Sequence, residues 1–293
     1  MRQMLFPWAA GLALAAPLSA QAPGTEVYLA KLTRRGSGLE VGEPKNLTNR
    51  PGYDNQPSFS PDGRVLFYTS TREDAQADIY KYDLRRAAAT KFTDTPESEY
   101  SATVMPGGKE VSVIRVERDS TQRLWAFPLA GGAPRIIVER VKPVGYHAWA
   151  DATTVALYVL GSPATLVVAN VGSGDTRSLL SNVGRSLHRV PKTRLISVTQ
   201  VVAEGTTWIV EVDPATGVLT PVVKTVPGSQ DYAWTPDGAI LMGAGPRLYR
   251  FRPGIDSAFV QIAELKGPGL QKIGRLAVSP KGDWLAIVSE EAR

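Results

Sequence analysis

The two histidines, His147 and His188, are the residues of this 293-residue chain whose type could most directly do chemistry. Imidazole titrates near neutral pH and is a common metal ligand. The two could form a metal-binding or acid–base pair, or they could be unrelated polar residues on loops or inner strands. The sequence specifies no third ligand, which favours the second interpretation.

Carboxylates are the other source of chemistry, and most acidic pairs fall in predicted connections. Asp231 differs because it directly precedes a predicted inner strand. A dedicated calcium site needs alternating oxygen ligands, and no loop has that pattern. Nucleophile elbows, phosphate loops and the His-Glu-x-x-His motif are absent. We therefore expect no catalytic residue, no metal ligand and no cofactor, with a channel-bound calcium ion as an unsupported alternative.

Composition and the N-terminus restrict the cell compartment and the partners. The absence of cysteine excludes disulfides and thiolate chemistry. The net charge of +5 is spread along the chain without a basic patch, so we expect no nucleic-acid partner. Residues 1–20 combine a basic start, an apolar run and a small-residue ending, which predicts a secretory signal peptide and an exported, periplasmic or secreted protein. No other segment reads as a transmembrane anchor.

A repeated phrase indicates which elements position these residues. Phe59-Ser60-Pro61-Asp62-Gly63 recurs in degraded form, and the residue at its proline position, here called the turn mark, falls at 61, 106, 151, 191, 236 and 280. A repeat of 40 to 45 residues with strand-like segments predicts a β-propeller. The turn has a physical basis, because proline presets φ, aspartate bonds to the local backbone and glycine accepts a positive φ.

Each repeat contains four short strands, as one propeller blade does. In the first unit they lie at 58–59, 65–70, 79–84 and 90–93. The sixth unit ends after two strands, and segments 26–32 and 45–49 match the missing pair. The sequence therefore predicts an all-β, six-bladed β-propeller of four-stranded antiparallel blades. It forms a single domain over residues 21–293 in which the N-terminal strands complete the last blade.

The phrase 55–63, followed by 67–70 and 78–80, resembles the WD40-like repeat of the TolB type, and 234–238 and 278–282 are similar to further copies. The resemblance covers essentially the whole mature chain. It implies a six-bladed exported propeller. TolB proteins work in the periplasm as protein-binding partners in the Tol-Pal envelope system and carry an α/β domain before the propeller, which we do not find in this sequence.

Aligning every blade on its turn mark predicts which residues surround one mouth of the central channel. The set is rich in Tyr and Arg and carries both signs of charge, which suits a specific protein partner. The candidate binding residues are Asn55, Gln56, Arg72, Glu99, Tyr100, Tyr146, His147, Arg185, His188, Asp231, Tyr232 and Arg275.

Alternatives stay open at this point. The tyrosines of the set could pack between blades, and we expect Phe59, Trp149 and Trp234 in the core. The leading hypothesis is a monomeric, non-catalytic, exported propeller that binds a protein or peptide in the cell envelope. The alternatives are a propeller enzyme acting on a sugar, lactone or other small molecule, and a purely structural envelope module.

Overall fold

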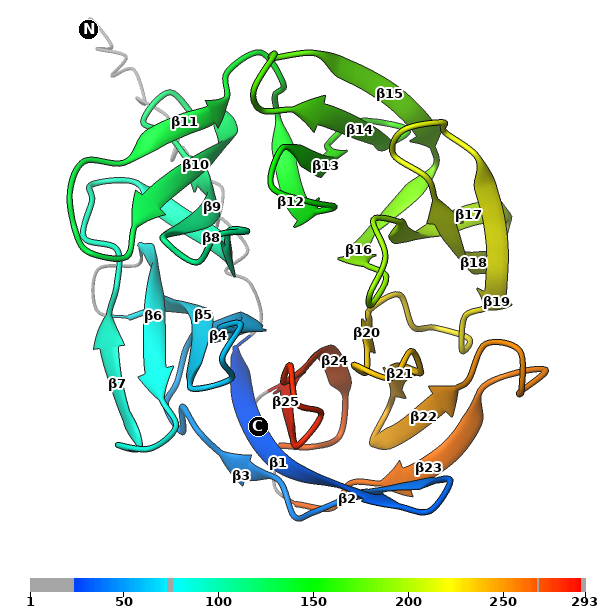
Figure 1. Cartoon of the computed structure of the whole chain (residues 1–293). Coiled ribbons are helices and arrows are strands. Elements are labelled where there is room, and N and C mark those ends of the chain that lie inside the picture. Colours follow the sequence, from blue (N-terminus) through cyan, green and yellow to red (C-terminus); the bar gives the residue numbers. More distant parts are fainter. Residues whose placement is uncertain (1–23, 73–75, 268, 291–293) are drawn as a thin grey trace, which may run out of the picture.

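The computed structural model describes residues 24–72, 76–267 and 269–290, and all of their regular structure is β-strand. The predicted signal peptide, 1–20, lies outside the described residues. The strands surround a central axis in a closed ring (Figure 1). Within the described part, no helix exists that could cross a membrane.

Four blades are separate four-stranded antiparallel sheets. Blade 2 contains β8 (Ser98–Val104), β9 (Glu110–Val116), β10 (Gln122–Pro128) and β11 (Arg135–Val138). Blade 3 contains β12 (Val144–Trp149), β13 (Thr154–Val159), β14 (Thr165–Asn170) and β15 (Thr176–Ser181). Blade 4 contains β16 (Val183–Arg189), β17 (Ile196–Ala203), β18 (Thr206–Val212) and β19 (Leu219–Lys224). Blade 5 contains β20 (Tyr232–Trp234), β21 (Ile240–Ala244), β22 (Arg247–Phe251) and β23 (Val260–Glu264).

The remaining strands form a nine-stranded sheet that consists of two blades. Blade 1 contains β4 (Tyr53–Phe59), β5 (Val65–Thr71), β6 (Ala77–Asp83) and β7 (Ala88–Lys91). Blade 6 contains β24 (Ile273–Val278), β25 (Trp284–Glu290) and β1 (Thr25–Arg35), with β2 (Gly38–Val41) and β3 (Lys45–Asn46) both paired to β1. A single parallel pair, Thr25 with Tyr53, joins the two blades.

The N-terminal strand closes the ring. β1 runs antiparallel to β25 from Thr25 opposite Glu290 to Lys31 opposite Trp284. This confirms the prediction that the N-terminal segment completes the last blade and covers a free sheet edge. Hairpin strand β2 is an addition that the repeat pattern did not predict.

The hydrophobic core lies between blades rather than in one centre. Six clusters of buried residues each combine side chains from two neighbouring blades, and together they cover every junction of the ring. One of them joins Tyr28 and Leu285 of blade 6 to Leu241 and Leu248 of blade 5. The described residues therefore form the predicted six-bladed ring.

Candidate functional site

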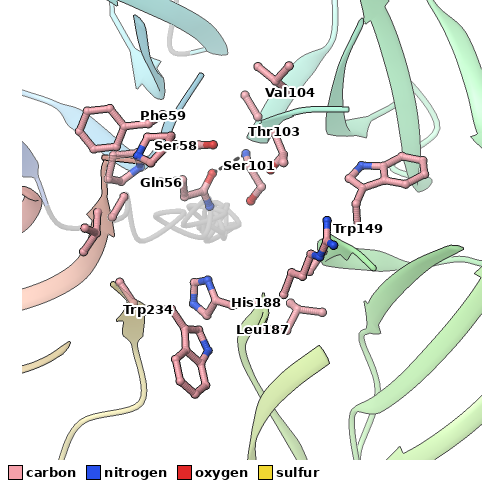
Figure 2. Close-up of a pocket in the computed structure, with 18 of the residues that line it drawn as sticks. Gln56, Ser58, Phe59, Ser101, Thr103, Val104, Trp149, Leu187, His188 and Trp234 are labelled. Carbon is pink, nitrogen blue, oxygen red and sulfur yellow. Dashed lines mark hydrogen bonds between the residues drawn. The ribbon is translucent and has the colours of Figure 1, made fainter. Parts of the chain in front are cut away.

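The site is the central cavity, which has a volume of about 930 Å³. It is lined by the innermost strand of every blade and by all five prolines that occupy a turn mark. Figure 2 shows Gln56, Ser58, Thr103, His188 and Trp234 around the open centre. The cavity therefore runs along the inner strands between a polar layer near their starts and the exposed turns after their ends.

Backbone irregularities shape the polar end. In five of the six blades the ladder between the first two strands shifts register near the start of the inner strand. Two residues at this point, Gln56 and Ser101, have φ of +56°, a left-handed conformation that is unusual without glycine. Bulges turn side chains out of the regular alternation. They let the strand starts present polar groups to the channel.

One position of the repeat, five residues before the turn mark, forms a layer across this end. Every blade contributes one residue, and all six line the cavity. They are Gln56, Ser101, Tyr146, Ser186, Asp231 and Arg275. Gln56 also ties two blades together, because its Oε1 accepts hydrogen bonds from Ser101 N at 2.8 Å and Thr69 Oγ1 at 2.8 Å. The layer is part of the inter-blade structure as well as of the cavity wall.

A contact between Arg275 and Tyr146 crosses the channel. Arg275 Nη2 donates to Tyr146 Oη at 2.7 Å, and the guanidinium carbon lies 4.6 Å from the centroid of the tyrosine ring. The two residues come from β24 and β12, which face each other across the ring in Figure 1. The polar layer that contains this contact thus forms the floor of the cavity, and the turns form its rim.

Asp231 lies at the centre of the floor between two arginines. Asp231 as a residue is 6% exposed, Arg185 Nη2 donates to Oδ2 at 2.8 Å, and Arg275 Nη1 is 3.6 Å from Oδ1. Burial alone would raise the pKa of Asp231, but the charges of Arg275 and Arg185 together with the Arg185 hydrogen bond hold the pKa below its ordinary value. Oδ1 is buried without a hydrogen-bond partner among the described residues. The floor therefore holds one ionised carboxylate and two guanidinium groups.

His147 of blade 3 is hydrogen-bonded to the Ser112 hydroxyl of blade 2. Ser112 Oγ donates to the Thr103 carbonyl at 3.1 Å and accepts from Trp149 Nε1 at 2.9 Å. Its remaining neighbour is His147 Nε2 at 2.7 Å, which therefore donates. Burial lowers the pKa of His147 to about 3, so the ring is neutral at pH 7.

The same arrangement, here called the serine clasp, occurs again between blades 4 and 5, which indicates a structural role. Ser197 Oγ accepts from Tyr232 Oη at 2.7 Å and Trp234 Nε1 at 2.8 Å, and donates to the His188 carbonyl at 3.3 Å. Each serine precedes its tryptophan by 37 residues. Ser112 and Ser197 have no solvent exposure. Although Ser112 and His147 are within hydrogen-bond distance, the serine is a buried acceptor between blades and is not placed as a nucleophile.

His188 differs from His147 in its surroundings. Its ring packs edge-on against Tyr232 with centroids 4.7 Å apart, and its Nε2 is 3.2 Å from Ser186 Oγ. Burial is the largest effect and lowers the pKa of His188 to about 4, against the opposing charge of Asp231. The two histidines do not contact each other, and no group of three His, Asp or Glu side chains suited to a metal ion occurs in the described part. A channel-bound calcium ion stays an untested alternative.

The cavity lining includes eight of the twelve candidates proposed from sequence. The other four lie elsewhere. Asn55 Nδ2 donates to Thr25 Oγ1 at 3.2 Å, at the closure between blades 1 and 6. Arg72 stacks on the Tyr80 ring at 3.8 Å. Tyr100 packs at the blade 2–3 junction, and Glu99 is fully buried between blades 1 and 2.

Sequence reasoning missed Tyr53 and placed three aromatic residues only in the core. Burial raises the pKa of Tyr53, and the nearby Arg275, Tyr146 and Arg185 also affect that pKa electrostatically. Phe59, Trp149 and Trp234 do pack between blades as predicted, but they also line the cavity. Their position two residues before the turn mark was the signal that could have placed them on the channel wall. Tyr53 lies outside that register window.

Comparison with known proteins supports the fold. No family model matches the sequence. A putative TolB from Agrobacterium tumefaciens aligns with a TM-score of 0.70 at 16% identity, covering 92% of this chain and 99% of that chain. TolB from Acinetobacter baumannii aligns with a TM-score of 0.60 at 14% identity, covering 92% of this chain and 65% of that one.

A third similar structure is an oligogalacturonate lyase in complex with manganese, with a TM-score of 0.57 at 15% identity over 85% of this chain and 80% of the lyase. Identities this low carry information about fold and none about activity. The sequence repeat, the ring of blades and these alignments agree, and the chain has a TolB-like β-propeller fold.

Proposed function

We propose that this chain is an exported β-propeller that binds a protein or peptide partner in its central cavity. The observation that carries the proposal is the cavity itself, an open space of about 930 Å³ with a polar floor and an aromatic wall. Residue types common in protein-binding hot spots, Tyr, Trp and Arg, line it.

The dimensions suit an extended peptide. Five residues of inner strand separate the floor from the turn mark, which corresponds to a depth of about 17 Å at about 3.3 Å per residue. A peptide segment of about five residues would span this depth. Above the floor it would meet the half-buried side chains of Phe59 and Trp234, which offer apolar surface, and the exposed edge of the largely buried Trp149.

Export to the bacterial envelope is part of the proposal. It rests on the leader-like residues 1–20 and on the TolB-like fold, because the resemblance to TolB proteins implies a periplasmic protein that binds other proteins. The partner would then be a component of the envelope.

Filling the cavity tests the proposal. Ser58 lines it, whereas Thr220 is exposed on outer strand β19. Ser58→Trp should abolish retention of an envelope protein by the purified propeller, and Thr220→Trp, which adds the same ring outside, should leave retention unchanged. Thermal unfolding of both variants shows whether the fold is kept. Equal retention by the wild type and a folded Ser58→Trp protein would refute binding in the cavity.

The same experiment addresses the enzyme alternative. A propeller enzyme acting on a sugar, lactone or other small molecule would retain no protein from the envelope, with or without the Ser58→Trp change. Its substrate would instead raise the thermal unfolding midpoint of the wild type and not of the filled variant. No feature of the described cavity favours this alternative specifically.

A further inference from the structure

The charge of the cavity is unbalanced. Among its described lining residues, the charged side chains are Arg185, Arg189, Arg275 and Asp231. Both histidines are neutral at pH 7, because burial lowers their pKa values to about 3 and about 4. Arg189 is exposed and its Nε donates to the Thr193 carbonyl, so two guanidinium groups, those of Arg185 and Arg275, lie beside the one carboxylate. The excess positive charge lies inside a concave wall, where low-dielectric surroundings concentrate the field. The interior attracts anions.

The arginines of the floor have more donors than their protein partners use. Asp231 accepts a hydrogen bond from Arg185, while Arg275 reaches it only at 3.6 Å and bonds to Tyr146 with its other nitrogen. Each guanidinium carries five N–H groups. The Arg185 side chain is 47% exposed and that of Arg275 is 15% exposed. Unused donors of both residues are thus available beside one another on the cavity floor.

We propose that Arg185 and Arg275 together bind a carboxylate of the peptide ligand, so that the cavity selects an acidic segment. This inference rests on the proposed function and specifies its ligand. Guanidinium groups bind carboxylates through paired, charge-assisted hydrogen bonds. Tyr146 adds a donor, because its oxygen accepts from Arg275 and its own hydroxyl hydrogen can point to the same carboxylate.

The arrangement of the wall determines where the acidic group lies in the ligand. The floor is about five residues from the turn mark, and the wall above it carries Phe59, Trp149 and Trp234. A peptide entering from the rim would therefore place an Asp, a Glu or its terminal carboxylate at the deepest position. Apolar residues would follow toward the rim, against the aromatic wall.

Asp231 has the opposite effect on the same ligand. Its ionised carboxylate neutralises part of the arginine charge and repels an incoming anion. Replacing it with asparagine keeps the shape and removes the competing charge. Asp231→Asn should therefore strengthen the binding of an acidic peptide, whereas Arg275→Gln should weaken it. A general loss of structure would weaken binding in both variants.

The test uses three pools of fluorescently labelled octapeptides of mixed sequence that differ in the C-terminal residue. The first pool ends in Glu with a free C-terminal carboxylate, the second in Gln with an amidated C-terminus, and the third in Lys with an amidated C-terminus. The wild type should bind the Glu pool at least tenfold more tightly than the Gln pool, and this preference should fall as salt is added. Arg275→Gln should lose on the order of tenfold to a hundredfold in affinity for the Glu pool. Arg140→Gln, at an exposed position outside the cavity, should lose none.

The outcomes separate this inference from the function on which it rests. Binding of peptides with no preference for Glu, or a preference unchanged by Arg275→Gln, overturns carboxylate recognition but leaves peptide binding intact. Weaker Glu-pool binding by a folded Asp231→Asn protein also overturns it. If no pool binds, while free glutarate binds to the wild type and not to Arg275→Gln, the ligand is a small molecule and both proposals fail.

Discussion

Replacing Glu99 with glutamine tests how the blade 1–2 junction responds to pH. The carboxylate has no solvent exposure, Thr95 Oγ1 donates to Oε1 at 2.5 Å, and Arg115 Nε is 3.4 Å away. Burial outweighs these favourable contacts and raises the pKa of Glu99 from 4.5 to about 7. The native state thus binds the proton of the Glu99 carboxyl group more tightly than the unfolded state does. Its contribution to stability is fully present below pH 4.5 and is lost as the pH rises through 7.

The size of the effect follows from the pKa shift. The change from 4.5 to about 7, at about 1.4 kcal/mol per pKa unit, gives an upper limit of about 3 kcal/mol. Urea unfolding at pH 5, 6, 7 and 8 measures it. The free energy of unfolding of the wild type, relative to that of Glu99→Gln, should fall by most of this amount between pH 5 and 8. Exposed Glu139→Gln should run parallel to the wild type. Parallel curves for Glu99→Gln would refute the reasoning.

Three further predictions follow from other contacts. Glu117→Gln should destabilise the protein at pH 7, because a hydrogen bond from the Arg123 guanidinium lowers the pKa of Glu117. The stability that the ionised carboxylate contributes is lost as the pH falls, so the difference in unfolding free energy between wild type and variant, measured by urea unfolding, should be smaller at pH 4 than at pH 7. Ser112→Ala and Ser197→Ala should each cost about 1–3 kcal/mol, measured the same way, because each leaves two buried donors without an acceptor; values near zero would contradict the serine clasp. In tag-free protein, the ring signals of His147 and His188 should not shift between pH 5.5 and 8 in NMR spectra, and a midpoint near 6.5 would contradict their burial.

The blades could be predicted from sequence because their information is local and repeated. The Pro-Asp-Gly turn and the strands around it are specified by neighbouring residues, and the period aligns even the eroded copies. The same register predicted that β1 belongs to the last blade. Hairpin strand β2 was not predicted because its four residues carry no copy of the repeat and it pairs only with β1.

The interior of the channel was only partly predictable, because bulges change which way side chains point. Strand residues alternate between faces, and an extra residue reverses the alternation. Glu99 and Tyr100 precede the irregularity in β8 and turn toward neighbouring blades, whereas Arg275 lies within that of β24 and reaches the cavity. The bond from Arg275 to Tyr146 joins residues 129 apart in opposite blades, which no local pattern encodes.

The most direct test of the account is site-specific photocrosslinking in the cell envelope of the organism that makes the protein. A benzophenone amino acid replaces Ser58 inside the cavity or Thr220 on the outer strand. If the cavity binds a protein partner, position 58 should give a discrete crosslinked product that position 220 does not, and excess acidic octapeptide should suppress it. The absence of a product at position 58, or the same product at both positions, would contradict the central claim.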